Sequence, residues 1–378
     1  MPSLNLQLNL PSTVGIADRV AIMEVCSDSH VQIAPAELYE HPDQIDGRNT
    51  EVLVSERIPR ELDAWPKLRF VQLLSAGINQ LAGHPIWKRG IPVATASGLY
   101  SVPMAQFATT ALLSLAHRMT EISQLKSTKQ WPNRGSLKGS IVRGKTVGIL
   151  GYGSIGRECA RQLACLGMRI VCMSRGCSRS NQDHFLAWPG TGDPHGEIPE
   201  QWFTPDQIHV MLPLCDTLLV AAPRTPATES FIGARELALL PPNAHVIVIS
   251  RGGIVDETAL AQALHSGHIG GAWVDAYLKE PPPPSHPLFT APNIVLTPHM
   301  SGVYKEYWKV FTRLLAENLR RVLGGEPAQP FVPQPRYLSI LGTGDGHAVA
   351  TRGAWAIEGR WVWWWKDYID RKWMRMYR

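Results

Sequence analysis

Three closely spaced glycines follow a short apolar run near the middle of the chain. The stretch KTVGILGYGSIGRECARQL starts with residues 145–150, an expected buried strand, and places Gly151, Gly153 and Gly156 where a helix should begin. The first glycine permits a tight turn, the second allows close backbone approach to a ligand, and the third lets helix and strand pack. Because a second apolar run follows at 168–174, the segment predicts a βαβ unit of a parallel sheet.

The same loop predicts a dinucleotide site, because the amino end of a helix and its open amides suit a pyrophosphate. Tight packing alone would also call for glycines, but the flanking strands and helix favour the nucleotide interpretation. The second strand ends in Ser174 and Arg175, where an NAD site usually has an acidic residue. A guanidinium accepts a 2′-phosphate that a carboxylate would repel, which favours NADP(H) and leaves NAD(H) possible. The alternative is that Arg175 is a solvated surface residue.

Short β-branched runs alternate with helical patterns along most of the chain, which is typical of parallel sheets covered on both faces. With 378 residues the chain is too long for one ordinary core. We therefore predict an α/β fold of two doubly wound parallel-sheet (Rossmann-like) domains with a cleft between them. Residues 102–119 should form a long helix, and the expected strands are 19–25, 50–55, 69–75, 145–150, 168–174, 217–222, 245–250, 271–277 and 293–297.

Two segments do not fit this alternation. Residues 176–210 are polar and rich in Gly and Pro, and we expect them to form an excursion on the surface. Residues 332–378 form a basic tail holding six of the 13 tryptophans, to which no period assigns a structure. The tail is either disordered, the mispredicted end of a gene, or an amphipathic contact with a membrane or a partner.

Composition excludes several classes of protein. The net charge of +5 gathers in the tail, so the body of the chain has no basic face that indicates nucleic acid. No apolar run is long enough for a membrane span, and the first residues lack a secretory signal, so we expect a cytoplasmic protein. The six cysteines lie mostly in apolar segments without paired CxxC spacing, which favours reduced thiols and no structural metal.

Arg251, Asp275 and His299 each stand at or just beyond the carboxyl end of a separate expected strand. These ends share one edge of a parallel sheet, which is the edge where the glycine loop lies and where ligands bind. Arg251 can grip a carboxylate through two hydrogen bonds, and His299 can donate a proton to a developing alkoxide. Glu280, just before PPPP at 281–284, is the candidate acid that stabilises the charged imidazole. Each residue alone has a structural explanation, but together they predict an acid–base site for a 2-oxo acid.

These motifs together resemble the D-isomer-specific 2-hydroxyacid dehydrogenase family over about residues 50–331. The matching blocks, in family order, are GILGYGSIG, PRTPATE (223–229), SRGGIVDETAL (250–260), VDAYLKEPPPPSHPLF (274–289) and NIVLTPHMSG (293–302). The resemblance implies reversible reduction of a small 2-oxo acid, of the glyoxylate or hydroxypyruvate type, to the D-2-hydroxy acid. It also implies homodimers formed through the nucleotide domain. An alternative from another class is a nucleotide-sensing binding protein similar to the C-terminal-binding corepressors.

The resemblance also implies roles for individual residues. Arg251, Glu280 and His299 would be the catalytic residues, and the amides of Ala76 and Gly77 in LSAGIN (74–79) would bind the substrate carboxylate, although packing alone would explain that glycine. Residues 1–101 and 304–331 would form a discontinuous substrate domain, and residues 102–303 the dinucleotide-binding domain. Besides the three glycines, Ser174 and Arg175, the expected cofactor contacts are Ser154, Ile155, Pro223, Ile249 and Asp275.

Overall fold

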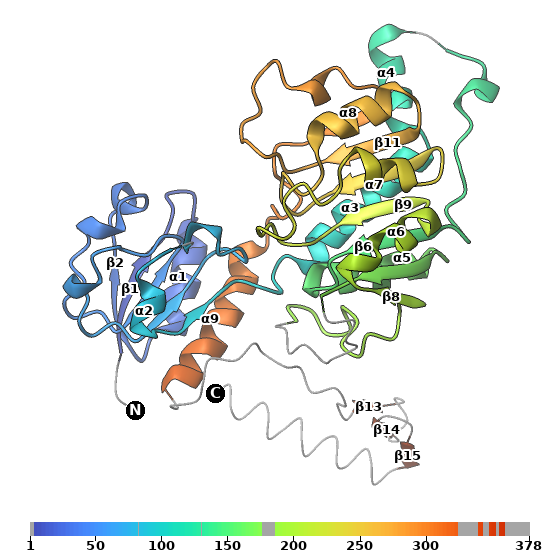
Figure 1. The fold of residues 1–378 in the computed structure, drawn as a ribbon. Helices are drawn as coiled ribbons and strands as arrows, with labels where there is room; N and C mark the ends of the chain where they lie inside the picture. Colours follow the sequence, from blue (N-terminus) through green and yellow to red (C-terminus); the bar gives the residue numbers. More distant parts are fainter. Residues whose placement is uncertain are drawn as a thin grey trace. The chain divides into compact units, whose positions relative to one another are not determined.

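The computed structural model describes residues 4–81, 83–129, 131–175 and 186–323, together with three short strands nearer the carboxyl terminus. The chain divides into two compact units, Met1–Phe331 and Val332–Arg378. The first unit holds a five-stranded and a seven-stranded sheet, and the second holds a three-stranded sheet (Figure 1).

Every strand pair of the five-stranded sheet is parallel, in the order β2-β1-β3-β4-β5. The chain therefore runs outward from β1 to β2 and then crosses back to build β3, β4 and β5 on the other side, which makes the sheet doubly wound. Its strands are β1 (Asn5–Asn9), β2 (His30–Ile33), β3 (Val52–Ser55), β4 (Phe70–Gln72) and β5 (Val93–Ala94).

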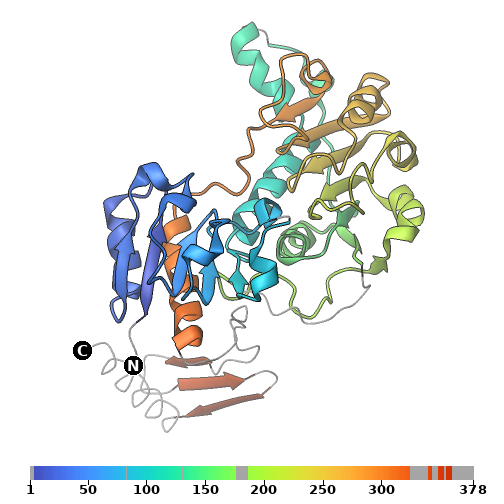
Figure 2. The same cartoon turned by 60° about the vertical axis from the view of Figure 1, so that its left-hand side comes forward.

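Alternate residues of these strands enter two separate cores. Val52 and Val54 pack on one face with helices α1 (Ile16–Val25) and α9 (Tyr307–Leu323), whereas Leu53 packs on the other with Trp65 and the short helix α2 (Ile86–Arg89). Helix α9 follows the second sheet in sequence, yet it lies against the first sheet, as Figures 1 and 2 both show. The chain thus returns to its first sheet at the end of the unit.

The seven-stranded sheet is also entirely parallel, in the order β12-β11-β10-β9-β6-β7-β8. Strand order reverses between β6 and β9, and a doubly wound sheet binds ligands beyond the carboxyl ends at such a point. The strands are β6 (Thr146–Leu150), β7 (Arg169–Met173), β8 (Gln201–Phe203), β9 (Thr217–Val220), β10 (Ala244–Val248), β11 (Ile269–Val274) and β12 (Ile294–Leu296).

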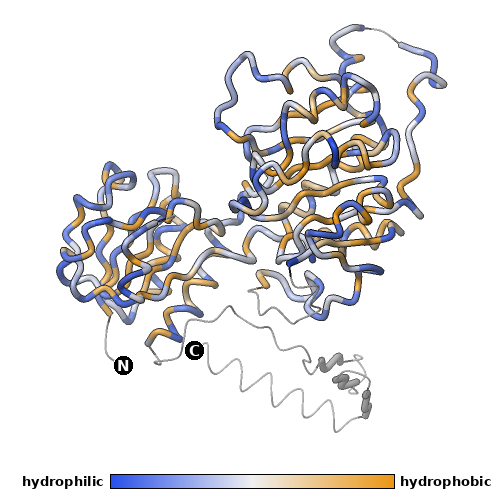
Figure 3. The backbone as a smooth tube through the Cα atoms, in the orientation of Figure 1, coloured by the Kyte–Doolittle hydropathy of each residue, from blue (hydrophilic) through white to orange (hydrophobic). Residues whose placement is uncertain are grey.

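Helices cover both faces of this sheet. Ile149 and Ile247 belong to the core beneath α3 (Ser101–Ala116) and α5 (Ser154–Cys165), whereas Leu150 and Val248 belong to the core on the opposite face. In Figure 3 the strands of this sheet are mostly apolar, and the loops around them are more polar. The predicted fold class is confirmed. The remaining helices of the described residues are α4 (Met119–Thr128), α6 (Ile208–Met211), α7 (Ala234–Leu239) and α8 (Glu257–His265).

The prediction of a strand at 19–25 was wrong. These residues belong to helix α1, and the first strand is β1, in a segment that we had not assigned. A short apolar run does not by itself distinguish a strand from a helix. Residues 5–9 form an interior strand of the sheet, where the polar side chain of Asn9 has a partner: its Nδ2 donates to Ser55 Oγ over 3.2 Å.

The expectation that 176–210 is only a surface excursion was also wrong. Residues 176–185 lie outside the described part of the chain, but Gln201–Phe203 form the edge strand β8 of the seven-stranded sheet. Asp193 is 5% exposed, and its Oδ2 accepts a hydrogen bond from Tyr152 over 2.6 Å. A long polar segment can therefore pack where a carboxylate finds buried donors.

In the second unit the described residues form an antiparallel sheet of β13 (Ser339–Gly342), β14 (Ala348–Arg352) and β15 (Trp355–Gly359). No structure could be predicted for this segment from its sequence. The Trp-rich stretch beyond Gly359 lies outside the described residues. Within the described residues, no helix is long and apolar enough to cross a membrane.

The described cysteines all carry free thiols. Four of them, Cys26, Cys159, Cys172 and Cys215, are buried, and Cys165 is exposed. Burial raises the pKa of the Cys26 thiol to about 12, so this group stays protonated at neutral pH. The four buried cysteines are small core residues, as predicted from the sequence, but Cys165 is not. Cys177 lies outside the described residues.

Candidate active site

The carboxyl ends of three neighbouring strands carry the predicted catalytic groups. Arg251 follows β10, Asp275 follows β11 directly, and His299 follows β12, and these strands are adjacent in the sheet. Gly151 and Pro223 follow β6 and β9 at the same edge. Parallel pairing therefore collects these residues on one side of the sheet, as predicted from the sequence.

His299 and Glu280 form a direct pair. The Nδ1 atom of His299 lies 2.8 Å from Oε2 of Glu280, and the two side chains are 41% and 37% exposed. The second oxygen, Oε1, accepts the amide hydrogen of Tyr277 over 2.9 Å, which fixes the carboxylate. A carboxylate beside Nδ1 orients the imidazole ring and leaves Nε2 to act on a ligand.

The turn that carries His299 is strained and is held by a buried carboxylate. His299 adopts a left-handed backbone conformation with φ of 52°, which is uncommon for residues other than glycine. Asp275 is fully buried and accepts hydrogen bonds from Thr297 Oγ1 (2.6 Å) and from the amides of Met300 and Ser301 (both 2.9 Å). Strained residues persist where their surroundings hold them, so Asp275 fixes the position of His299.

The loop that supports Glu280 has an anchor that sequence reasoning missed. Glu257, the first residue of α8, accepts the amide hydrogen of Leu278 through Oε1 over 2.6 Å, and its Oε2 lies 2.7 Å from Nε2 of His286. Leu278 and His286 lie on either side of Glu280 in the sequence, so the Glu257 carboxylate holds both ends of the loop that carries Glu280. The available signal was the pairing of acid and imidazole in VDE and SHP, which spacing alone does not connect.

The glycine loop fits a pyrophosphate group. A Cβ on Gly151 would lie 2.6 Å from the Ala222 backbone, and one on Gly156 would lie 2.2 Å from the carbonyl oxygen of Gly151. These two glycines are required by internal packing. A Cβ on Gly153 would have no neighbour within 4 Å, so nothing in the described structure requires glycine there and the space is left for a ligand. Gly153 is also the N-cap of α5, where a helix amino end favours an anion.

The other predicted cofactor contacts lie around this loop. Ser154 and Ile155 form the first turn of α5, and Ile249 follows β10. Ser174 follows β7 and is half-buried, and Arg175 beside it is exposed. Arg175 thus stands at the carboxyl edge of the strand next to β6, as its predicted role requires.

The predicted substrate turn contacts Arg251 directly. A Cβ on Gly77 would lie 2.5 Å from Nη2 of Arg251, so a larger residue there would require this guanidinium to move. Nη1 of the same guanidinium donates to the carbonyl of Ser250 over 2.8 Å. In the described part of the chain, the amides of Ala76 and Gly77 donate to no acceptor. The two sheets thereby bring a guanidinium and two open amides together, which is a suitable set of donors for a carboxylate.

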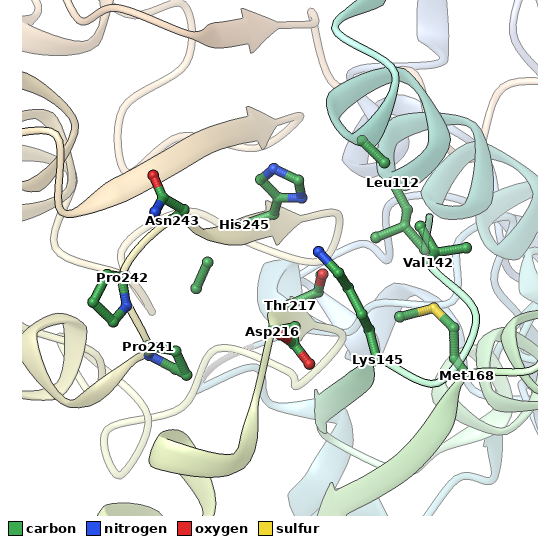
Figure 4. A pocket seen from close by; sticks show the side chains of 12 residues that line it. Leu112, Val142, Lys145, Met168, Asp216, Thr217, Pro241, Pro242, Asn243 and His245 are labelled. Atoms are coloured by element: carbon green, nitrogen blue, oxygen red, sulfur yellow. The ribbon is translucent and has the colours of Figure 1, made fainter. Parts of the chain in front are cut away.

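A cavity of about 270 Å³ lies at the opposite edge of the seven-stranded sheet. Lys145, Asp216 and His245, labelled in Figure 4, line it where β6, β9 and β10 begin. Burial and the charge of Lys145 lower the pKa of His245 to about 4, so this imidazole is neutral at physiological pH. The cavity is therefore separate from the predicted catalytic edge.

Comparisons with known proteins agree with this geometry. Residues 109–301 match the family model for the D-isomer specific 2-hydroxyacid dehydrogenase, NAD binding domain. The chain belongs to the D-isomer-specific 2-hydroxyacid dehydrogenase family. It is accordingly a dehydrogenase that acts on CH–OH groups and uses a nicotinamide cofactor.

Individual members of the family show how far the similarity extends. A glyoxylate reductase from Thermofilum pendens is 31% identical over 278 residues, covering 72% of this chain and 78% of the relative. An (S)-sulfolactate dehydrogenase from Chromohalobacter salexigens is 30% identical over 269 residues, covering 71% and 82%. A family member from Xanthobacter autotrophicus Py2, solved with NADPH and MES, superposes with a TM-score of 0.70 at 25% identity, covering 87% of this chain and 98% of that chain.

Proposed function

We propose that this dehydrogenase uses NADPH in preference to NADH to reduce a small 2-oxo acid, of the glyoxylate or hydroxypyruvate type, to the D-2-hydroxy acid. The observation that carries the proposal is the His299–Glu280 pair at 2.8 Å, on the sheet edge that also carries Arg251 and the glycine loop. An imidazole held by a carboxylate is a proton donor matched to a carbonyl that becomes an alcohol.

In this proposal each residue acts on one part of the substrate. Arg251 and the amides of Ala76 and Gly77 bind the carboxylate, and the guanidinium also polarises the neighbouring carbonyl. His299 donates a proton from Nε2 to the C2 oxygen, while Glu280 stabilises the imidazolium before the transfer. In the reverse direction the same imidazole accepts that proton, so one pair serves both directions.

A bound reduced nicotinamide supplies the hydride that C2 receives. The chain's part is to hold the dinucleotide across the carboxyl ends of β6 and β9, with the pyrophosphate at the amino end of α5. We assign the nicotinamide carboxamide to the carbonyl of Ile249 and to Asp275, and the ribose phosphate to Ser174 and Arg175. The complete proposed set is Gly151, Gly153, Ser154, Ile155, Gly156, Ser174, Arg175, Pro223, Ile249 and Asp275.

The preference for NADPH rests on Arg175, which is exposed where an acidic residue would hold the ribose of NADH. That the Xanthobacter relative was solved with NADPH supports this choice. The test compares the dissociation constants of NADPH and NADH for the wild type and for Arg175→Asp. We expect the substitution to weaken NADPH binding by roughly tenfold or more, because it exchanges a charge-assisted bond for repulsion. Equal affinities of the wild type for both cofactors would refute the preference.

The substrate class is tested by turnover. Glyoxylate, hydroxypyruvate and pyruvate are offered to the purified protein with NADPH and with NADH, and the chirality of the product is determined. The proposal requires glyoxylate or hydroxypyruvate to give the highest kcat/KM and hydroxypyruvate to give a D product. The name of the Thermofilum relative, a glyoxylate reductase, supports this range. An enzyme that reduces none of the three would contradict the proposal.

We further propose that residues 1–101 and 304–331 form the substrate domain and residues 102–303 the dinucleotide domain. The supporting observation is that α9 shares its core with β1 and β3, although the seven-stranded sheet lies between them in sequence. Proteolysis between the domains would test it, because cleavage near 101 and 303 should release a fragment that still binds cofactor.

A homodimer through the dinucleotide domain is also proposed. Between α3 and β6 the chain exposes three large apolar side chains: Met119 (47%), Trp131 (93%) and Ile141 (78%). Three exposed large apolar side chains within one segment support a contact surface there, and a second copy is the proposed partner. Sedimentation of the wild type should give a dimer, and the double variant Trp131→Ser, Ile141→Ser should shift it toward monomer. A monomeric wild type at micromolar concentration would contradict this.

A cytoplasmic location completes the proposal. It is supported by five free thiols among the described residues, since disulfides are rare in a reducing compartment. Fractionation of cells that express the chain would test it, and recovery in a membrane or secreted fraction would contradict it.

A further inference from the structure

A carboxylate that the proposed mechanism does not use lies next to the substrate turn. Glu56 follows β3 by one residue, and the turn Ser75–Gly77 follows β4. Because β3 and β4 are parallel neighbours, both segments emerge at the same edge of the five-stranded sheet. This is the edge at which Arg251 reaches Gly77.

Hydrogen bonds connect Glu56 to this turn. The side-chain nitrogen of Gln80 donates to Oε1 of Glu56 over 3.1 Å and also contacts Oγ of Ser75 at 3.2 Å. Ser75 in turn donates to the carbonyl of Gly77 over 2.9 Å. The Glu56 side chain is thus fixed relative to the turn whose amides we assign to the substrate carboxylate.

Glu56 has two arginines near it but no ion-pair partner among the described residues. Its neighbour Arg57 is paired with Glu40 at 2.6 Å, and among the described residues no Lys or Arg forms an ion pair with Glu56. The charge of Arg251, on the other sheet, acts to lower the pKa of Glu56. In the proposed mechanism, however, this guanidinium binds the substrate carboxylate. Partial burial raises the pKa of Glu56, against the smaller effects of Ser75 and the charges of Arg57 and Arg251, so its charged form is poorly solvated.

Glu56 is placed to contact the substituent that the substrate carries on C2. The carboxylate end is engaged by Arg251 and the amides of the turn, and the C2 oxygen by His299. What remains is the substituent on C2, which in the proposed binding mode lies beside the turn, on the side where Glu56 is held. A second anion there would meet an uncompensated carboxylate, whereas a hydroxyl would find a hydrogen-bond acceptor.

We propose that Glu56 determines the substrate range: it admits glyoxylate and those 2-oxo acids whose C3 carries only hydrogen or a hydroxyl, and it excludes those with a second anionic group. This inference rests on the proposed function and refines it, because it separates this enzyme from one that takes an acid such as sulfolactate, which carries a sulfonate. Glu56 is a specificity-determining residue, and it takes no part in proton or hydride transfer.

The experiment measures kcat/KM of the NADPH-dependent reaction for glyoxylate, pyruvate, hydroxypyruvate, oxaloacetate and 3-sulfopyruvate. Pyruvate is the reference, because the last three differ from it only in the group on C3. The variants are Glu56→Gln, which removes the charge and keeps the shape, and Glu56→Asp, which keeps the charge. Glu24→Gln is the matched control, since Glu24 is an exposed carboxylate on α1 away from the site.

We expect Glu56→Gln to raise kcat/KM for oxaloacetate and for 3-sulfopyruvate, each relative to pyruvate, by roughly tenfold or more, because the like-charge repulsion is lost. The ratio of hydroxypyruvate to pyruvate should fall by about threefold to tenfold, because a neutral acceptor is weaker than a charged one. Glu56→Asp should keep the exclusion of both dianions, and Glu24→Gln should leave every ratio unchanged.

Two failures can be told apart. A wild type that reduces none of the five acids refutes the proposed function itself. A wild type that reduces glyoxylate or hydroxypyruvate, with ratios that do not move in Glu56→Gln, leaves the proposed function standing and overturns the role of Glu56. Efficient reduction of oxaloacetate by the wild type would overturn it as well. Melting temperatures of all variants confirm that folded proteins are being compared.

Discussion

The Nδ1 atom of His299 lies 2.8 Å from Oε2 of Glu280, although the two residues belong to different loops. We predict that Glu280→Gln, which keeps the shape of the side chain, lowers kcat by about ten- to a hundredfold, because an amide does not stabilise the imidazolium that gives up the proton. Cofactor affinity should not change. Steady-state kinetics measure the effect, and Lys279→Gln, an exposed neighbour in the same loop, is the control. Equal kcat values for Glu280→Gln and the control would remove Glu280 from the chemistry.

Asp275 should contribute to both stability and activity, because it is buried and accepts three hydrogen bonds from residues 297–301. Asp275→Asn turns an amide group toward one of those donors, and we expect it to lower the free energy of unfolding by about 2 to 3 kcal/mol. Thr297→Val removes only one of these bonds and should cost about 1 kcal/mol. Urea unfolding measures both. A smaller loss for Asp275→Asn than for Thr297→Val would show that the turn is held by other contacts.

Two glycines of the phosphate loop should respond differently to the same substitution. Gly153→Ala adds a methyl group with no protein atom within 4 Å, at a φ of −83° that alanine adopts, so the melting temperature should hold while cofactor binding weakens. Gly156→Ala would place its methyl group 2.2 Å from the Gly151 carbonyl oxygen, which should destabilise the fold by about 1 to 3 kcal/mol. Thermal unfolding and cofactor titration separate the two effects. Unchanged cofactor affinity in Gly153→Ala would contradict the assigned pyrophosphate site.

His245 predicts a pH dependence of stability. Burial lowers its pKa from 6.5 to about 4 in the folded chain, so the unfolded chain binds more protons between these values. The contribution of His245 to the free energy of unfolding is therefore fully present above pH 6.5. It is lost as the pH falls toward 4, and the loss is at most about 3 kcal/mol. His245→Gln should flatten the decline of unfolding free energy between pH 6.5 and pH 4. Parallel curves for variant and wild type would contradict this assignment.

The edge of the sheet where the catalytic groups meet could be predicted from sequence, because it depends on little more than strand order and direction. Arg251, Asp275 and His299 each end a strand, and parallel pairing then places them together. Local pattern did not reveal the left-handed backbone of His299 or the hydrogen bonds that Asp275 makes to its turn. Those depend on contacts between residues more than 20 positions apart.

The errors had a similar origin. Residues 19–25 look like a strand because they are apolar, but they form a helix once β1 occupies the sheet next to β3. Glu56 was missed because a single acid in SERIP has no motif around it. Its one available signal was that it follows an expected strand at 50–55, and the same rule that located Arg251 would have selected it.

The most direct test of the account is the rate of NADPH oxidation with glyoxylate and with hydroxypyruvate, measured for the wild type and for His299→Gln. We predict turnover by the wild type and a fall in kcat of roughly 10² to 10⁴ in the variant, with an unchanged dissociation constant for NADPH. A binding protein of the same fold would bind the cofactor and show no turnover in either form. Turnover in His299→Gln equal to that of the wild type would contradict the account, because the proton would then come from another group.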